Sequence, residues 1–220
     1  MNTPIESKSQ ARPLTTTSYA ILAVLSLRPH STYDLAKQTG LSLRYLWPRA
    51  DSNLYAEPKR LVEAGLASAR EEWTGSRKRT VYSITDSGLE ALREWVGSPS
   101  AEPRFESEAL LKIFFGEHGT PEQMRVTLDA LHATAQIGVE HFQSIADTYD
   151  RDGGQYPHRF ALSAIVARLL LEQQIALERW ARWAKELVEG WDTTETPESA
   201  EWGVATMRAP LALDLSLIHI

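Results

Sequence analysis

Two groups of side chains have the chemistry to contact a nucleic acid. The first lies within a stretch of eight residues and consists of Ser52, Asn53, Tyr55 and Lys59. An asparagine amide can form two hydrogen bonds with adenine, and serine, tyrosine and lysine can bind phosphate oxygens. The second group follows a Gly-Ser pair and consists of Arg77, Lys78 and Arg79. Three adjacent cations attract phosphates, and an arginine can enter a narrow minor groove.

Each group also has a purely structural interpretation. Ser52 can cap a helix, Tyr55 can pack on a core, and charged residues are common in solvated turns. The negative charge of Asp51 opposes phosphate binding, so we assign this residue to helix capping. Arg44 and Arg49 are further basic candidates with less support from their positions.

The elements that must position these side chains follow from hydrophobic spacing and capping residues. A first helix is expected near 19–27, a second from Ser31 or Thr32 to Trp47, and a third from Asp51 or Ser52 to Gly65. Strand-like runs at 66–73 and 80–84 flank a turn at 74–79 that carries the three cations, and a fourth helix starts at Thr85. This order predicts a winged helix-turn-helix, in which a three-helix core holds one helix rigidly for the major groove.

Pro58 lies inside the third expected helix. A proline there removes one backbone donor and crowds the carbonyl group of Leu54. We therefore expect a bend near the second turn of this helix.

The second half of the chain has the pattern of long helices. After a linker at 97–103, helices are expected at 105–115, from Thr120 to about 149, and from about 158 to 189. Two helices of this length struggle to bury their apolar faces alone, which favours packing against a second copy. The expected fold is mostly α with a small β-hairpin wing, a winged helix-turn-helix followed by an α-helical dimerisation domain. Its parts are a disordered arm (1–14), a winged helix-turn-helix (15–97), a linker (98–104), a dimerisation domain (105–191) and a loose tail (192–220), in which residues 215–220 resemble a translated sequencing adapter.

Charge divides between the same two halves. Residues 1–100 carry a net charge of +3 and residues 101–220 a net charge of −9, which gives the overall −6. Such asymmetry indicates that one half meets an anion and the other does not. The polar N-terminus does not resemble a signal peptide, and no continuous apolar run approaches the roughly 18 residues that a bilayer requires, so we expect a cytoplasmic protein without membrane contact.

The composition argues against an enzyme. The chain has no cysteine, and its six histidines show no His-Glu-x-x-His spacing. A Gly-rich phosphate loop and a Gly-x-Ser-x-Gly motif are also absent from the sequence. We therefore expect no catalytic residues, no metal and no cofactor.

Tryptophan is abundant, with seven residues in the chain. Indole rings stack well on flat apolar ligands, so Trp47, Trp95, Trp180 and Trp183 are candidates for an aromatic pocket at a dimer centre. Trp95, which ends the helix that joins the two halves, and Trp47 are the residues we assign to an effector pocket. The structural alternative is that these rings only fill the core and the dimer interface.

Several segments in fixed order resemble the PadR family of regulators. The N-terminal matches are Tyr33-Asp34-Leu35, Leu46-Trp47-Pro48, 53–61 (Asn-Leu-Tyr-Ala-Glu-Pro-Lys-Arg-Leu), Gly65-Leu66 and 81–88 (Val-Tyr-Ser-Ile-Thr-Asp-Ser-Gly). Residues 106–116 and 178–183 resemble the start and the closing helix of that family's C-terminal region. The resemblance covers about 15–190 and implies a homodimer that binds double-stranded operator DNA, usually represses transcription, and is released by a small molecule or a stress signal. Pro58 departs from the family pattern, because many members carry an apolar residue other than proline there.

The function expected from the sequence is therefore sequence-specific DNA binding by a homodimeric transcriptional regulator, a repressor on a palindromic operator that a small aromatic effector releases. A winged-helix module that binds protein rather than DNA is the alternative. A regulator controlled only by its own abundance is a further one.

Overall fold

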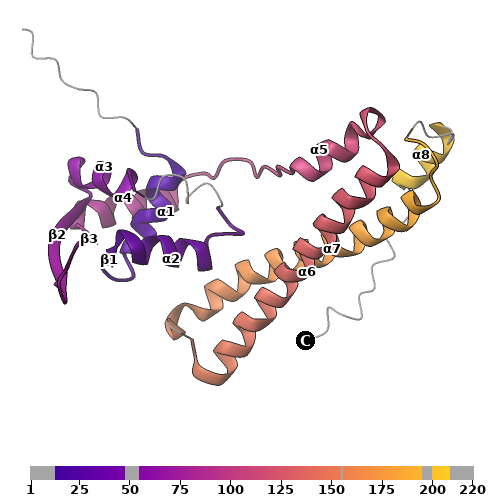
Figure 1. Cartoon of the computed structure of the whole chain (residues 1–220). Helices are drawn as coiled ribbons and strands as arrows, with labels where there is room; N and C mark the ends of the chain where they lie inside the picture. The colour runs from indigo at the N-terminus through magenta and orange to yellow at the C-terminus, as the bar shows by residue number, and fades with distance from the viewer. Residues whose placement is uncertain (1–12, 48–54, 155, 195–199, 209–220) are drawn as a thin grey trace, which may run out of the picture. The chain divides into compact units, whose positions relative to one another are not determined.

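The structure, a computed structural model, describes residues 13–47, 55–154, 156–194 and 200–208 (Figure 1). The chain divides at Pro103 into two compact units, Met1–Pro103 and Arg104–Ile220. We call them the reader unit and the helical unit and describe each by itself.

The reader unit combines short helices with a small sheet. In chain order its elements are α1 (Thr16–Leu25), β1 (His30–Ser31), α2 (Thr32–Ser42), α3 (Glu57–Glu63), β2 (Ala67–Thr74), β3 (Arg77–Ile84) and α4 (Asp86–Gly97). The core contains one cluster of fully buried side chains that includes Ile21, Leu22, Leu25, Leu35 and Leu61. These residues come from α1, α2 and α3, so a single apolar centre holds all three helices together.

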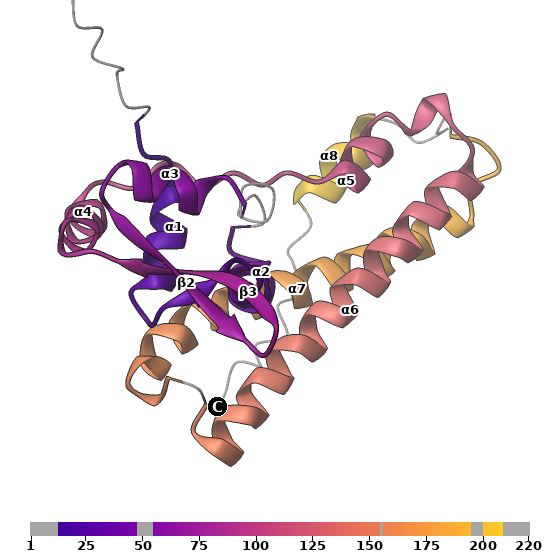
Figure 2. The same cartoon turned by 60° about the vertical axis from the view of Figure 1, so that its left-hand side comes forward.

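The sheet has three antiparallel strands in the order β1-β3-β2. The long hairpin of β2 and β3 runs in register from Ala67 opposite Ile84 to Thr74 opposite Arg77, and Figure 2 shows its two strands as separate arrows. β1, which sequence patterns did not indicate, pairs His30 with Tyr82. The fold class expected from the sequence is confirmed, and β1 anchors the wing to the helical core.

Side-chain caps set the starts of most helices in the reader unit. Ser31 begins α2 through a reciprocal capping box with Asp34, and Thr85 accepts a hydrogen bond from the backbone N–H of Gly88. The cap of α1 is Thr15, one residue before the expected hydroxyl run, and it too forms a capping box. Gly88 is required for packing, because a Cβ atom there would collide with the carbonyl oxygen of Leu66.

The expectation that Pro58 bends the third helix is wrong. The described part of α3 begins at Glu57, with Ala56 as its N-cap, so Pro58 occupies the first turn. The backbone N–H groups of a first turn have no partner within the helix, so a proline there costs no helical hydrogen bond. Its ring is almost fully buried and contributes to the core instead.

The wing also differs from the expectation. β2 has the predicted length but is shifted by one residue, whereas β3 begins three residues earlier than predicted. The turn between them is therefore only Gly75-Ser76, with Gly75 at a φ of 60°. Such a positive φ suits glycine, which has no Cβ atom. Arg77, Lys78 and Arg79 therefore belong to β3 rather than to the turn.

The helical unit is built around two long helices. Its elements in order are α5 (Glu108–Phe114), η2 (Gly116–His118), α6 (Pro121–Asp152), η3 (Pro157–Arg159), α7 (Phe160–Glu189) and α8 (Ala200–Arg208). The start of α6 is the predicted one, with a capping box between Thr120 and Gln123 and Pro121 in the first turn. Gly153, at a φ of 69°, ends this helix, and α7 returns along it. Figures 1 and 2 both show α6 and α7 side by side.

Polar contacts hold α6 and α7 together at several levels. His132 Nε2 lies 2.9 Å from Glu178 Oε1, and Lys185 Nζ lies 2.6 Å from Asp129 Oδ1. Few large side chains are buried between the helices. The buried positions of α6 and α7 are Leu128, Ala135, Gly138, Phe142, Ala181, Ala184 and Val188. Small residues therefore allow a close approach of the two helices.

Two features of the helical unit differ from expectation. The segment expected to be a loose tail contains α8. Residues 157–189 are also long and apolar enough to span a membrane by length and composition, although the chain has no uninterrupted apolar run there. Ion pairs on α7 such as Arg168–Glu172 and Arg182–Glu178 interrupt the apolar sequence.

Candidate nucleic-acid interface

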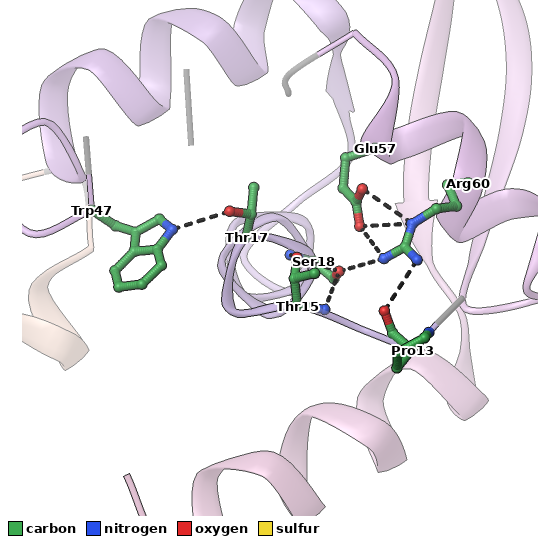
Figure 3. Close-up of polar contacts among 7 residues, drawn as sticks. All are labelled: Pro13, Thr15, Thr17, Ser18, Trp47, Glu57 and Arg60. Carbon is green, nitrogen blue, oxygen red and sulfur yellow. Dashed lines mark hydrogen bonds and ion pairs between the residues drawn. The ribbon is translucent and has the colours of Figure 1, made fainter. Parts of the chain in front are cut away.

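Helix α3 is clamped to α1 by a single arginine, Arg60. Its Nη2 atom lies 2.6 Å from Glu57 Oε1 and donates a hydrogen bond of 2.7 Å to Ser18 Oγ (Figure 3). Arg60 Nη1 also donates to the carbonyl oxygen of Pro13 at 3.3 Å. The guanidinium group thus joins α3, α1 and the segment before α1. Because it makes several hydrogen bonds in one plane, it sets the orientation of α3.

The clamp leaves two predicted contact residues pointing to solvent. Tyr55 is 73% exposed and lies just before α3, and Lys59 is exposed within it. Glu57 and Pro58, on the same short segment, are buried. The predicted contact residues Ser52 and Asn53, together with Asp51 and Arg49, lie outside the described residues. The segment therefore has a buried side that fixes it and an exposed side that carries Tyr55 and Lys59.

The wing cations are paired with glutamates of β2. Lys78 Nζ lies 2.7 Å from Glu71 Oε1, and Arg79 Nη2 lies 3.1 Å from Glu72 Oε2. Arg70 approaches the same Glu72 carboxylate at 2.7 Å. Successive residues of a strand point to opposite faces, so Lys78 and Arg79 lie on different faces of the hairpin. The cations predicted to cluster on a turn are thus two strand residues, Lys78 and Arg79, that form ion pairs with the neighbouring strand. Arg77 is the first residue of β3, and its side chain lies outside the described part of the structure.

Two carboxyl groups of the reader unit have lowered pKa values. The Ser31 hydroxyl group donates a hydrogen bond to Asp34 and lowers the pKa of this carboxyl, which outweighs the effect of its partial burial. Loss of solvent raises the pKa of Glu72, but hydrogen bonds from Arg79 and Arg70 outweigh it, so this pKa also lies below its ordinary value. Both groups stay ionised near neutral pH. Asp34 caps α2, and Glu72 offsets the positive charge of the wing.

The two tryptophans assigned to an effector pocket both have partners inside the reader unit. Trp47 Nε1 donates a hydrogen bond of 3.1 Å to Thr17 Oγ1 (Figure 3). Trp95 stacks on Tyr19, with ring centroids 4.9 Å apart and ring planes at 6°. The stack ties α4 to α1 and leaves Trp95 37% exposed. Their role in ligand binding stays a prediction.

Three features of this surface were not found from the sequence. The clamp of Glu57 and Arg60 lies within the motif that suggested the family, but nothing in the spacing indicated its contact with Ser18. Tyr33, in the first turn of α2, is 77% exposed, and Trp73, opposite Lys78 on the wing, is 68% exposed. Large aromatic residues this exposed suit a surface that meets a partner.

The family profile described as "Transcriptional regulator PadR-like family" matches residues 21–94, and the profile "Virulence activator alpha C-term" matches residues 107–189. Among curated proteins, the "Negative transcriptional regulator PadR" of Bacillus subtilis (strain 168) is 30% identical over 99 residues. These residues are 44% of this chain and 54% of that relative, so the alignment spans about half of its length.

Solved structures resemble nearly the whole described chain. Bacillus subtilis PadR in complex with operator DNA has a TM-score of 0.63 and 21% identity, and the match covers 79% of this chain and 99% of that one. The same protein in complex with p-coumaric acid has a TM-score of 0.59 and 20% identity, with coverage of 80% and 99%. At these identities the likeness is one of fold, and it extends over both units.

Proposed function

This chain belongs to the PadR-like family of transcriptional regulators, which are not enzymes, and we propose that it binds a palindromic operator as a homodimer and represses transcription. The observation that carries the proposal is the clamped α3, which presents Tyr55 and Lys59 to solvent from a segment whose other side is buried. A recognition helix needs one buried side and one exposed side, because its exposed side chains can contact bases only if the protein core holds the helix rigidly in the groove.

The proposed DNA contacts fall into two classes, those to bases and those to the phosphate backbone. Ser52, Asn53, Tyr55 and Lys59 would contact bases and nearby phosphates, and Arg77, Lys78 and Arg79 would contact the backbone beside them. DNA phosphates would compete with Glu71 and Glu72 for Lys78 and Arg79, which are 2.7 Å and 3.1 Å from these glutamates. The wing would therefore contribute less to affinity than three unpaired cations would.

A homodimer accounts for the apolar surface of the helical unit. Leu162, Ile165, Val166 and Leu169 are 40–70% exposed and recur at the spacing of one helix face. Burying a fully exposed side chain of this kind contributes about 1.5–3 kcal/mol, and each of these partly exposed residues would contribute a corresponding fraction to an interface. A two-fold dimer through these faces would place two copies of α3 for the two halves of a palindrome.

Release by a small aromatic effector is the remaining part of the proposal. It is motivated by the p-coumaric acid bound to Bacillus subtilis PadR and by the aromatic residues of this chain, with Trp95 and Trp47 as the residues predicted from its sequence. A soluble regulator of this kind would act in the cytoplasm, without membrane contact.

Fluorescence anisotropy of the full chain on labelled DNA from upstream of its own gene tests DNA binding. We expect saturable binding that exceeds binding to scrambled DNA and weakens steeply with salt. Lys59→Ala should lower affinity roughly tenfold and reduce the salt slope by about 1. Lys112→Ala, on an exposed position of α5, should change neither. Equal affinity for both DNAs, with Lys59→Ala without effect, would instead favour a winged-helix module that binds protein.

A further inference from the structure

The helical unit contains a pocket of about 260 Å³ that the DNA-binding proposal does not use. Parts of α5, η2, α6 and α7 line it, together with the segment after α7. Its walls include three indole rings and an aliphatic floor, namely Trp180, Trp183, Trp191, Met124, Leu128 and Ala184. Apolar, aromatic walls with few polar groups are typical of sites for small flat ligands. The volume suits a compound of one or two rings.

One of the lining residues, Trp191, has a hydrogen-bond donor without an acceptor among the described residues. The Nε1 atom of Trp191 is buried and has no hydrogen-bond partner among the described residues. Buried indole N–H groups are normally paired, as the N–H group of Trp47 is with Thr17. The segment with Trp191 is held in place, since Thr194 Oγ1 donates a hydrogen bond of 3.2 Å to the carbonyl oxygen of Gly119. An acceptor on a ligand would complete the bonding of Trp191 once the side chains that cover this nitrogen move aside.

The charges around the pocket limit the ligand further. Glu117 is among its lining residues, and the described lining contains no lysine or arginine. Arg125, next in sequence to the lining residue Met124, is engaged elsewhere, because it contacts Glu122 at 3.1 Å and donates to the carbonyl oxygen of Val188 at 3.1 Å. His118 Nε2, 3.6 Å from Glu117, is on a largely exposed ring. A carboxylate in the pocket would face the negative charge of Glu117, whose side chain is 53% exposed, and the described lining offers no cation to offset it.

We propose that this pocket binds planar, uncharged aromatic compounds of one or two rings that carry a hydrogen-bond acceptor for Trp191, and that it rejects aromatic carboxylates. The inference rests on the proposed function in one respect, because it makes the pocket the effector site of the regulator. The site lies among residues of the helical unit, so it takes the place of the effector site predicted from the sequence at Trp95 and Trp47.

Isothermal titration calorimetry of the full chain without DNA tests the ligand class. The probes are 2-naphthamide and 2-naphthoate, which have nearly the same shape and differ in charge. We expect saturable binding of 2-naphthamide and at least tenfold weaker binding of 2-naphthoate. Absence of saturable 2-naphthamide binding, or preference for the carboxylate, would overturn the proposal.

Variants locate the binding within the pocket. Trp191→Phe keeps the ring but removes the donor, and should weaken 2-naphthamide binding about three- to tenfold. Ala184→Leu places a larger side chain in the cavity and should abolish it. Glu117→Gln should bring the affinities of the two probes closer together. Trp73→Phe and Glu122→Gln, which change the same residue types outside the pocket, should bind like the unchanged chain.

Folding of each variant is checked by circular dichroism and thermal unfolding. If Ala184→Leu does not fold, the 2-naphthamide affinity of Trp191→Phe alone tests whether the ligand binds in this pocket. Binding that survives both Trp191→Phe and a folded Ala184→Leu would overturn the site. If 2-naphthamide binds but leaves operator affinity unchanged in anisotropy, the pocket is not the effector site. Failure of operator binding alone would overturn the proposed function and leave the calorimetry intact.

Discussion

The two units use apolar residues in different ways. In the reader unit, fully buried Ile21, Leu22, Leu35 and Leu61 meet in one cluster, and six large hydrophobic residues are exposed among those described. In the helical unit the buried hydrophobic positions include three alanines, and fifteen large hydrophobic residues are exposed among those described. The reader unit therefore buries most of its large apolar side chains within itself, whereas the helical unit leaves an apolar surface that another molecule can cover.

This difference separates two ways in which a helix gains stability. The helices of the reader unit are short and depend on capping boxes and on neighbours within the same unit. Helix α7 is long, packs mainly against α6, and presents Leu162, Ile165 and Leu169 to solvent. A long helix with an exposed apolar face is most stable when a partner covers that face.

The largest expected effect concerns the exposed face of α7. Ile165→Asp should weaken self-association at least on the order of 100-fold, because a symmetric interface would lose two buried aliphatic side chains and gain two carboxylates. Sedimentation-velocity ultracentrifugation measures it. Ser163→Asp, outside the apolar stripe of the same helix, is the control. A monomeric unchanged chain, or equal association of both variants, would remove the proposed contrast between the units.

A smaller effect is expected inside the reader unit. Arg60→Ala should destabilise it by roughly 1–3 kcal/mol, because the buried Glu57 carboxylate and the Ser18 hydroxyl group lose their shared partner. The matched control is Arg93→Ala, since Arg93 and Glu90 form a pair of the same spacing that is 69% and 65% exposed. Thermal unfolding compares the two. Equal losses would mean that Arg60 is an ordinary surface residue and not a clamp.

A substitution in the wing should have a smaller effect, and it should strengthen DNA binding rather than weaken a property of the protein. Glu72→Gln removes the carboxylate that Arg70 and Arg79 share, so DNA affinity should rise about two- to fivefold, in line with the strength of exposed ion pairs. Anisotropy at low salt measures this gain, and Glu94→Gln on the exposed side of α4 serves as control. An unchanged affinity would place the wing away from the DNA.

The smallest effect is a dependence of the reader unit's stability on pH. His30 is 1% exposed, and neither ring nitrogen has a hydrogen-bond partner among the described residues. Burial, aided by the nearby Arg28 charge and opposed by Asp34, lowers the pKa of His30 below its ordinary 6.5. The unfolded chain therefore takes up a proton first as pH falls. The stability due to neutral His30 is complete above pH 6.5 and declines below it, towards the lowered pKa.

Thermal unfolding at pH 7.5 and 5.5 checks this dependence. His30→Phe should reduce the loss of stability at the lower pH, whereas His118→Gln, at an exposed position, should not. A loss in His30→Phe as large as in the unchanged chain would show that the buried imidazole has no part in it.

Several local features of this molecule were predictable because their causes are local. Thr120 with Gln123, Pro121 and Ser31 signal helix starts through backbone groups only a few residues away. Two strand-like runs indicated the hairpin, but the length of β3 was underestimated because the pairing of Lys78 and Arg79 with β2 extends the ladder beyond Thr80. Pro58 was misjudged because its effect depends on where α3 begins, and a proline in a first turn is harmless.

By itself, the sequence determined the order of the elements other than β1 and α8, the opposite charges of the two halves and the resemblance to the PadR-like family, since periodicity, caps and composition are written along the chain. Only the tertiary structure decided which polar groups meet. Arg60 and Ser18 are 42 residues apart, and Trp191 joins Trp180 and Met124 around one pocket from three different segments. Such contacts depend on how helices pack, and packing brings together residues whose separation along the chain has no periodicity to reveal it.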